Sequence, residues 1–311
     1  MQQDDLVALT RAAQRLETVD LATHLSQLIG MPIEKAMAAF PGHWSTIVAR
    51  VTQAALSKAL KGALWTMTAK KRKPTNKMHK LLAGLSGAVG GSFGIMALAI
   101  ELPISATIML RSIADIARHE GEDLASLEAK LECLTVFALS GGSATAESAD
   151  TSYYAARSFL AKALNDTTSH ITAQGFSKEG APALVKLINA VATRFSIPVS
   201  EKVMVQALPA VGALGGAAVN VLFIEHFQQM AKAHFTVRRL ERQYGKPLIA
   251  ARYSAIVKAN SQSTSKVWNS LYWLTDDVIT HEAQVDKKGT HSGTVGQVIV
   301  ADRIDRDSKR R

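Results

Sequence analysis

Cysteine, aromatic residues and catalytic motifs are scarce in this chain. Its 311 residues include one cysteine, Cys133, which excludes an internal disulfide framework and fits a reducing compartment. Cys133 lies in an apolar run, so we expect an inert core thiol. Aromatic residues make up only 6% of the chain, a composition that favours packed helices over a β-sandwich. We therefore predict an all-α, multi-helix bundle.

The signatures of common enzymes are also absent from the sequence. It contains no G-x-S-x-G elbow, no phosphate loop, no H-E-x-x-H and no paired C-x-x-C. The first residues lack the lysines and the apolar core of a secretory signal, so we expect no export. The sequence thus favours a non-enzymatic role, and it assigns no catalytic residue, metal or cofactor.

Basic residues outnumber acidic ones, and the excess has a local source. The net charge is +10, which indicates an anionic partner such as nucleic acid or acidic lipid. Residues 70–80 (KKRKPTNKMHK) carry a run of cations, which are Lys70, Lys71, Arg72, Lys73, Lys77 and Lys80. No aromatic side chains for base stacking lie among them, so nucleic acid is the less favoured partner. This polybasic segment is either a solvated connector between helices or a contact for anionic lipid.

Two long uncharged stretches, residues 81–100 and 203–224, are the main features of the sequence. A helix of twenty residues is about 30 Å long, enough to cross a bilayer. Both stretches carry glycines at four-residue spacing, which would let another backbone approach closely. These glycines are Gly87, Gly90, Gly91 and Gly94 in the first stretch and Gly212, Gly215 and Gly216 in the second.

Three interpretations of these two stretches remain open. They could be buried core helices, obligate membrane spans through 81–110 and 203–224, or elements that insert only under some conditions. Apolar residues favour insertion by about 0.3 to 0.6 kcal/mol each, but an acid such as Glu101 near mid-bilayer costs about 3 kcal/mol. We also expect Pro103 to break or kink the first helix and to open a new one.

Polar residues next to the apolar stretches form a candidate network. Its members are Glu101, Arg111, Asp115, Asn220, Glu225, His226, His234, Arg238 and Arg239. We favour buried ion pairs of Glu101 and Asp115 with arginines of this set, which would fix the helix register. One alternative is a ligand pocket made by the same groups. Another is a hydrolase or metal-dependent enzyme that uses Glu101, His226 and His234, because the two histidines lie two turns apart on one helix face.

The sequence also suggests how the chain is divided. We predict an N-terminal helical segment over 1–43, a main helical domain over 44–285 and a polar, disordered tail over 286–311. GAVGG at 87–91 matches GALGG at 212–216, and each stretch leads into an amphipathic helix that ends at a glycine, Gly121 or Gly245. This match predicts an internal pseudo-repeat, and chance similarity of apolar sequence is the alternative.

Two segments resemble the EcsC family of bacterial proteins. They are LLAGLSGAVGGSFGIMALAIELPISATIMLRSIADIARHEGEDL (81–124) and VSEKVMVQALPAVGALGGAAVNVLFIEHFQQMAKAHFTVRRLERQYG (199–245). The resemblance extends from about residue 44 to 255 and leaves the N-terminal helices outside. It implies a helical bacterial protein, named for a gene beside those of an ABC-type exporter, and it provides no catalytic residues.

The resemblance and the polybasic segment together set our functional expectation. We expect a cytoplasmic bacterial protein at the inner face of the cytoplasmic membrane, either peripheral or conditionally inserted. Its expected partner is anionic lipid or a membrane protein such as an ABC-type transporter, and the sequence predicts no oligomeric state.

Overall fold

The computed structural model describes residues 1–18, 21–33, 35, 44–66, 94–140, 152–174, 181–208 and 212–261. The regular structure in these ranges is helical throughout, which confirms the predicted all-α fold. The chain divides into two compact units, Met1–Val257 and Lys258–Arg311. Only residues 258–261 of the second unit are described. The polybasic segment 70–80, the glycines Gly87, Gly90 and Gly91, and the predicted tail 286–311 lie outside the described residues.

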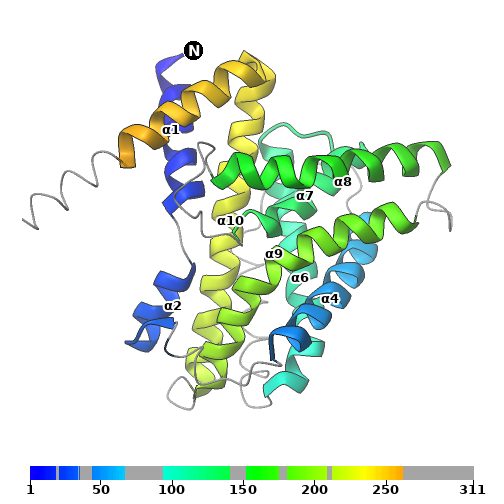
Figure 1. The fold of residues 1–311 in the computed structure, drawn as a ribbon, viewed down its shortest axis with the longest axis vertical. Helices are drawn as coiled ribbons and strands as arrows, with labels where there is room; N and C mark the ends of the chain where they lie inside the picture. Colours follow the sequence, from blue (N-terminus) through cyan, green and yellow to red (C-terminus); the bar gives the residue numbers. More distant parts are fainter. Residues whose placement is uncertain are drawn as a thin grey trace, which may run out of the picture. The chain divides into compact units, whose positions relative to one another are not determined.

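The compact unit is built on long helices that pack side by side. In chain order they are α1 (Gln3–Thr18), α2 (Leu21–Ile29), α4 (Trp44–Thr66), α6 (Gly94–His119), α7 (Leu127–Thr135), the 3-10 turn η1 (Val136–Ala138), α8 (Ser152–Gln174), α9 (Ala181–Ala207) and α10 (Gly212–Tyr244). Residues 246–257 are also helical. Figure 1 shows α10 along the length of the bundle, with α6 and α9 beside it.

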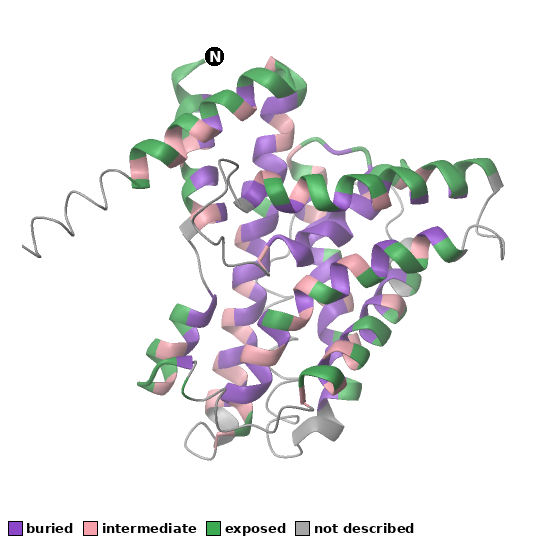
Figure 2. Ribbon diagram, in the orientation of Figure 1, coloured by how far each residue is buried: buried purple, intermediate pink, exposed green. Residues whose placement is uncertain are grey.

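Four phenylalanines form an aromatic cluster in the core around α10. Phe223 and Phe227 of α10 pack against Phe195 of α9 and Phe137 of η1, with neighbouring ring centroids 4.6 to 6.0 Å apart. All four side chains are buried, and Figure 2 shows the buried residues continuing along α6 and α10. Burying each ring contributes about 1.5 to 3 kcal/mol, so this cluster holds α9, α10 and η1 together.

The expectation that Pro103 breaks the first apolar helix is wrong. Helix α6 runs from Gly94 to His119 with Pro103 in its interior. Leu102 and Ala106, on either side of the proline, are fully buried, and the hydroxyl of Thr107 donates to the carbonyl of Pro103 at 2.7 Å. A proline in a helix interior costs about 3 kcal/mol. Burial of apolar side chains on both sides of Pro103 offsets that cost.

The second apolar stretch, 203–224, is divided between two helices instead of forming one. Helix α9 ends at Ala207, Leu208 is not helical, and α10 begins at Gly212. Leu208 precedes Pro209, and a residue before proline is disfavoured in helical conformation. The start of the first stretch, 81–93, lies outside the described residues, and its described helix continues past the predicted end at Ile100 to His119.

Glycines mark both ends of the two central helices. Gly94 begins α6 and Gly212 begins α10; Gly215 is half-buried and Gly216 is buried within the bundle. Gly121 and Gly245 have φ angles of 84° and 90°, a left-handed conformation that favours glycine. This confirms the two predicted helix ends. The internal repeat itself stays a prediction.

The N-terminal helix belongs to the same compact unit as the central helices. Asp5 of α1 accepts hydrogen bonds from Arg239 and Tyr244 of α10, at 3.3 and 2.7 Å. Helix α1 also packs its apolar face, including the fully buried Leu9, into the shared core. The described part of segment 1–43 is therefore not a separate body.

Candidate functional site

Glu101 forms a buried ion pair that the sequence did not predict. Its Oε1 atom lies 2.6 Å from Nζ of Lys202 on α9, and the Lys202 side chain is completely buried. Burial lowers the pKa of Lys202, while the carboxylate of Glu101 opposes that shift. The ammonium also lies 5.1 Å from the ring centroid of Phe223. The predicted arginine partner of Glu101 is wrong, since a lysine from α9 takes that place.

The other predicted network residues are distributed over several contacts. Asp115 pairs with Arg118 at 2.7 Å. Arg239 binds Glu120 at 3.0 Å and Asp5 at 3.3 Å. Three further members differ in exposure: Asn220 is buried, Glu225 is half-buried and Arg111 is exposed. Asp115 and Arg239 therefore pair with residues outside the predicted set.

His226 is buried against the end of η1. Its Nε2 atom lies 2.5 Å from Oγ of Ser140 in a hydrogen bond, and its Nδ1 atom has no hydrogen-bond partner among the described residues. Burial lowers the pKa of His226 to about 4, and the nearby charge of His24 acts in the same direction. The imidazole is therefore neutral at physiological pH and links α10 to the turn that ends at Ser140.

The burial of His226 predicts a loss of stability in mild acid. Between pH 6.5 and 4 the unfolded chain binds a proton at this histidine that the folded chain does not, so stability falls as pH falls. We expect the wild type to lose about 2 kcal/mol more than His226→Gln between pH 7 and 5, measured by urea unfolding. His170→Gln, at an exposed histidine, is the matched control. Equal losses in all three proteins would contradict the prediction.

His234 has different partners from His226 and lies in a second buried cluster. Its Nδ1 atom is 2.9 Å from the hydroxyl of Tyr153, and its Nε2 atom is 3.2 Å from Oε1 of Glu132. Among the described ranges, no group of three His, Cys, Asp or Glu side chains could hold a metal ion. The hypothesis of a metal site on Glu101, His226 and His234 therefore has no support in the described geometry.

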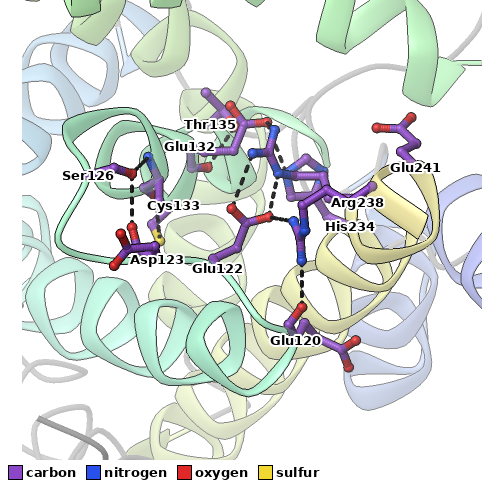
Figure 3. A network of polar contacts seen from close by, with 12 residues as sticks. Glu120, Glu122, Asp123, Ser126, Glu132, Cys133, Thr135, His234, Arg238 and Glu241 are labelled. Atoms are coloured by element: carbon purple, nitrogen blue, oxygen red, sulfur yellow. Dashed lines mark hydrogen bonds and ion pairs between the residues drawn. The ribbon is translucent and has the colours of Figure 1, made fainter. Parts of the chain in front are cut away.

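Arg238 is the centre of this second cluster, as Figure 3 shows. Its Nε atom donates to Glu122 at 2.8 Å, and its Nη1 atom lies 3.1 Å from Glu132. Arg242 also pairs with Glu122. Burial would raise the pKa of Glu132, but contacts with His234 and Arg238 outweigh it and lower the pKa to about 2. Glu132 is thus a buried carboxylate that is ionised at neutral pH.

A second arginine extends the cluster onto α8. Both Nη atoms of Arg157 donate to the carboxylate of Glu241, at 2.7 and 3.0 Å, in a bidentate pair. The hydroxyl of Tyr154 donates to the same carboxylate at 3.1 Å. Arg157 also donates to Tyr153 at 3.3 Å. The cluster therefore joins α7, α8 and α10, and of its members only His234 and Arg238 were singled out from the sequence.

A cavity of about 480 Å³ opens beside this cluster. Residues of α7, α8, α10 and the helical segment after Gly245 line it, and Glu132, Arg157, Arg238 and Glu241 are among its charged lining residues.

Cys133, next to Glu132, is buried, and burial raises the pKa of its thiol. Cys133 is thus a core residue, as its sequence context predicted.

The outer face of α6 is a second candidate site, which we call the α6 apolar face. It consists of Ala99, Ile100 and Ile104, which are exposed on a helix whose inner residues are buried. Ile100 is 71% exposed and Ile104 is 49% exposed. Further along the same helix the exposed positions are Arg111 and His119. The solvent side of α6 thus changes from apolar to charged along its length.

One helix in the described part of the chain, Pro182–Ala207, is long and apolar enough to cross a membrane. It forms most of α9, and core helices of soluble proteins meet the same criterion. Its residue Lys202 is paired inside the bundle. Of the spans predicted from sequence, 203–224 shares only residues 203–207 with this helix, and 81–110 lies partly outside the described residues.

The described fold and sites define an all-α bundle with buried ion pairs between its helices. A family model described as the EcsC protein family matches residues 5–240, so the chain belongs to that family. The sequence resemblance left the N-terminal helices outside the family region. The match begins within α1, so these helices lie inside that region. No curated protein and no solved structure matches the chain.

Proposed function

We propose that this protein binds anionic lipid at the inner face of the bacterial cytoplasmic membrane. The observation that carries the proposal is the α6 apolar face, because Ile100 and Ile104 are exposed on a helix that contributes most of its described apolar residues to the core. Burying an isoleucine side chain contributes about 1.5 to 3 kcal/mol, so contact with lipid acyl chains would stabilise this face.

The position of the α6 apolar face supports a membrane contact. In Figure 1 the N-terminal ends of α6 and α10 lie at the same end of the bundle, and the two helices contact each other. The uncharged stretch 81–93 leads directly into α6 in sequence, and the polybasic segment 70–80 precedes it. Apolar and cationic elements thus follow one another in the chain, the combination that binds acidic membrane surfaces.

The proposed binding is peripheral, with electrostatic attraction as its first step. Each basic residue near an anionic surface contributes about 1 kcal/mol, and the net charge of +10 acts in the same direction. Screening by salt weakens such an interaction. Conditional insertion of the first apolar stretch would also require the ion pair between Glu101, just after the stretch, and Lys202 of α9 to break.

We predict that replacing Lys70, Lys71, Arg72 and Lys73 together by glutamine lowers binding to anionic vesicles. Flotation with vesicles of phosphatidylglycerol and phosphatidylcholine, compared with phosphatidylcholine alone, measures the effect. Losing four cations removes about 4 kcal/mol at most, so bound protein should fall severalfold or more at low salt.

Two further variants separate the apolar from the electrostatic contribution. Ile100→Asn should weaken binding at high salt, whereas Thr193→Asn, at an exposed position on α9, should not. Unchanged binding of both the glutamine variant and Ile100→Asn would contradict the proposal. Binding to native membranes but not to protein-free vesicles would favour a membrane protein partner, such as an ABC-type transporter.

A further inference from the structure

The turn at the end of α2, residues 28–32 (LIGMP), is apolar and lies on the surface. We call it the α2 tip. Leu28 is 41% exposed and Met31 is 44% exposed, and Gly30 and Pro32 are exposed as well. Apolar residues that lie together on a protein surface indicate a contact with a partner or a membrane. The α2 tip is therefore a candidate contact surface.

The α2 tip is anchored on both sides. Before it, Leu25 of α2 is fully buried, and after it Ile33 is only 2% exposed. The amide of Ile33 donates to Oγ of Ser26 at 3.0 Å, which closes the turn. Gly30 has a φ angle of 70°, a left-handed conformation that favours glycine. The anchored turn therefore keeps its two large apolar side chains exposed.

The α2 tip lies towards the end of the bundle where α6 and α10 begin. Helix α2 contacts α9 and α10, and Figure 1 shows it beside the lower part of α10, towards the end where α6 starts. The described residues at this end contain no Asp, Glu, Lys or Arg in four ranges, which are 21–33, 94–100, 203–208 and 212–224. We call these ranges the charge-free end.

The charges that border the charge-free end neutralise each other. Glu101 follows it on α6 and Lys202 precedes it on α9, and these two side chains pair at 2.6 Å inside the bundle. From Gly94 to Ile100 helix α6 rises about 10 Å. An interfacial element buries its apolar face about 5 to 10 Å into the boundary between lipid headgroups and acyl chains. The charge-free end thus has the depth of a bilayer interface.

We propose that the α2 tip inserts into the bilayer interface together with the α6 apolar face, so that the charge-free end faces the membrane. This inference rests on the proposed function, and it adds a second contact and an orientation of the bundle. The net charge of +10 favours approach to an anionic surface, and the charge-free end contains no acid that would oppose it. A bilayer reaches both apolar elements at once, because its surface extends across the whole end of the bundle.

The exposed apolar residues of α1 provide a matched comparison. Leu6 and Val7 are 37% and 42% exposed, close to the values in the α2 tip. They lie among charged residues, because Asp4 precedes them and Arg11 follows them on the same helix. In Figure 1 the start of α1 lies at the marked N-terminus, at the other end of the bundle from the start of α6. We therefore expect these two residues to stay in water.

The first test measures insertion in the full chain with vesicles of phosphatidylglycerol and phosphatidylcholine. Met31→Cys carries an NBD label, and labelled Val7→Cys is the control. Native Cys133 is buried and burial raises the pKa of its thiol, so it does not compete for the label. On adding vesicles we expect the label on the α2 tip to shift its emission to the blue and to be quenched by spin-labelled lipid. The label on α1 should show neither change.

The second test measures the contribution of the α2 tip to binding. Replacing Leu28 and Met31 together by glutamine should weaken binding to the same vesicles about tenfold, because two apolar side chains no longer enter the interface. Replacing Leu6 and Val7 together by glutamine should leave the binding as in the wild type. All four residues are exposed, so melting temperatures close to that of the wild type should show that both variants are folded.

The outcomes separate this inference from the proposed function. If the wild type binds vesicles but the label on the α2 tip is unchanged, or the glutamine variant of the α2 tip binds equally well, the inference fails and the proposed function stands. If the wild type does not bind vesicles, both fail. A blue shift of the same label that grows with protein concentration in the absence of vesicles would identify a second copy of the chain as the occupant and would also overturn the inference.

Discussion

Replacing Lys202 by methionine should lower the free energy of unfolding by about 3 to 5 kcal/mol. Methionine fills nearly the same volume, so packing around Phe223 changes little, but the carboxylate of Glu101 loses its buried partner. A buried charge without a partner carries its full desolvation cost. Urea unfolding followed by circular dichroism measures the difference.

Two controls show whether the lost partner causes this effect. The double variant Glu101→Met, Lys202→Met removes both charges and should recover most of the stability, because an apolar pair replaces the ion pair at little net cost. Arg118→Gln breaks a more exposed pair, in which both side chains are 19% exposed, and should cost about 1 kcal/mol or less. A double variant as unstable as Lys202→Met alone would contradict the explanation.

Replacing Arg238 by methionine should cost a similar amount, about 3 to 5 kcal/mol. Arg238 is the cation shared by Glu122 and Glu132, whose side chains are each only 6% exposed. Its removal leaves Glu132 with His234 as its nearest remaining partner. We expect a lower urea midpoint, with the largest deficit at neutral pH, where both carboxylates are ionised in the unfolded chain.

The neighbouring arginine provides a matched comparison. Arg238→Lys cannot bridge two carboxylates with a planar fork, so it should remain destabilised by about 2 kcal/mol. Arg239→Lys changes a side chain that is 37% exposed, and it should cost about 1 kcal/mol or less. Equal losses of stability in Arg238→Lys and Arg239→Lys would show that the buried contacts of Arg238 stabilise the fold no more than the exposed contacts of Arg239.

Local signals in the sequence predicted much of the fold. Gly121 and Gly245 end helices as expected, because left-handed backbone favours glycine at these positions. The low aromatic content correctly indicated helices. Pro103 was misjudged because the expectation considered only the local cost of a proline, whereas the burial of Leu102 and Ala106 depends on neighbours far away in sequence.

Local sequence signals could not predict which residues pair in the ion pairs. Glu101 pairs with Lys202, and Arg157 pairs with Glu241, so each contact joins helices that are distant in the chain. Which residues meet depends on the register between packed helices, and a shift of one turn replaces every partner. A weaker signal existed for Lys202, a cation directly before the apolar run 203–205 of α9. Tyr153 and Arg157, four residues apart, likewise share a helix face.

The Glu101–Lys202 pair joins two helices that each contain a proline. Pro103 lies within α6 and Pro198 within α9, and each lacks the amide proton that a helical backbone would use. The carbonyls of Ala99 and Arg194, four residues earlier, therefore lose their usual donors. Transient opening of the backbone, seen as fast amide exchange, should begin at these two turns. Water would then reach the ion pair first, so this pair is where the core of the bundle is first hydrated.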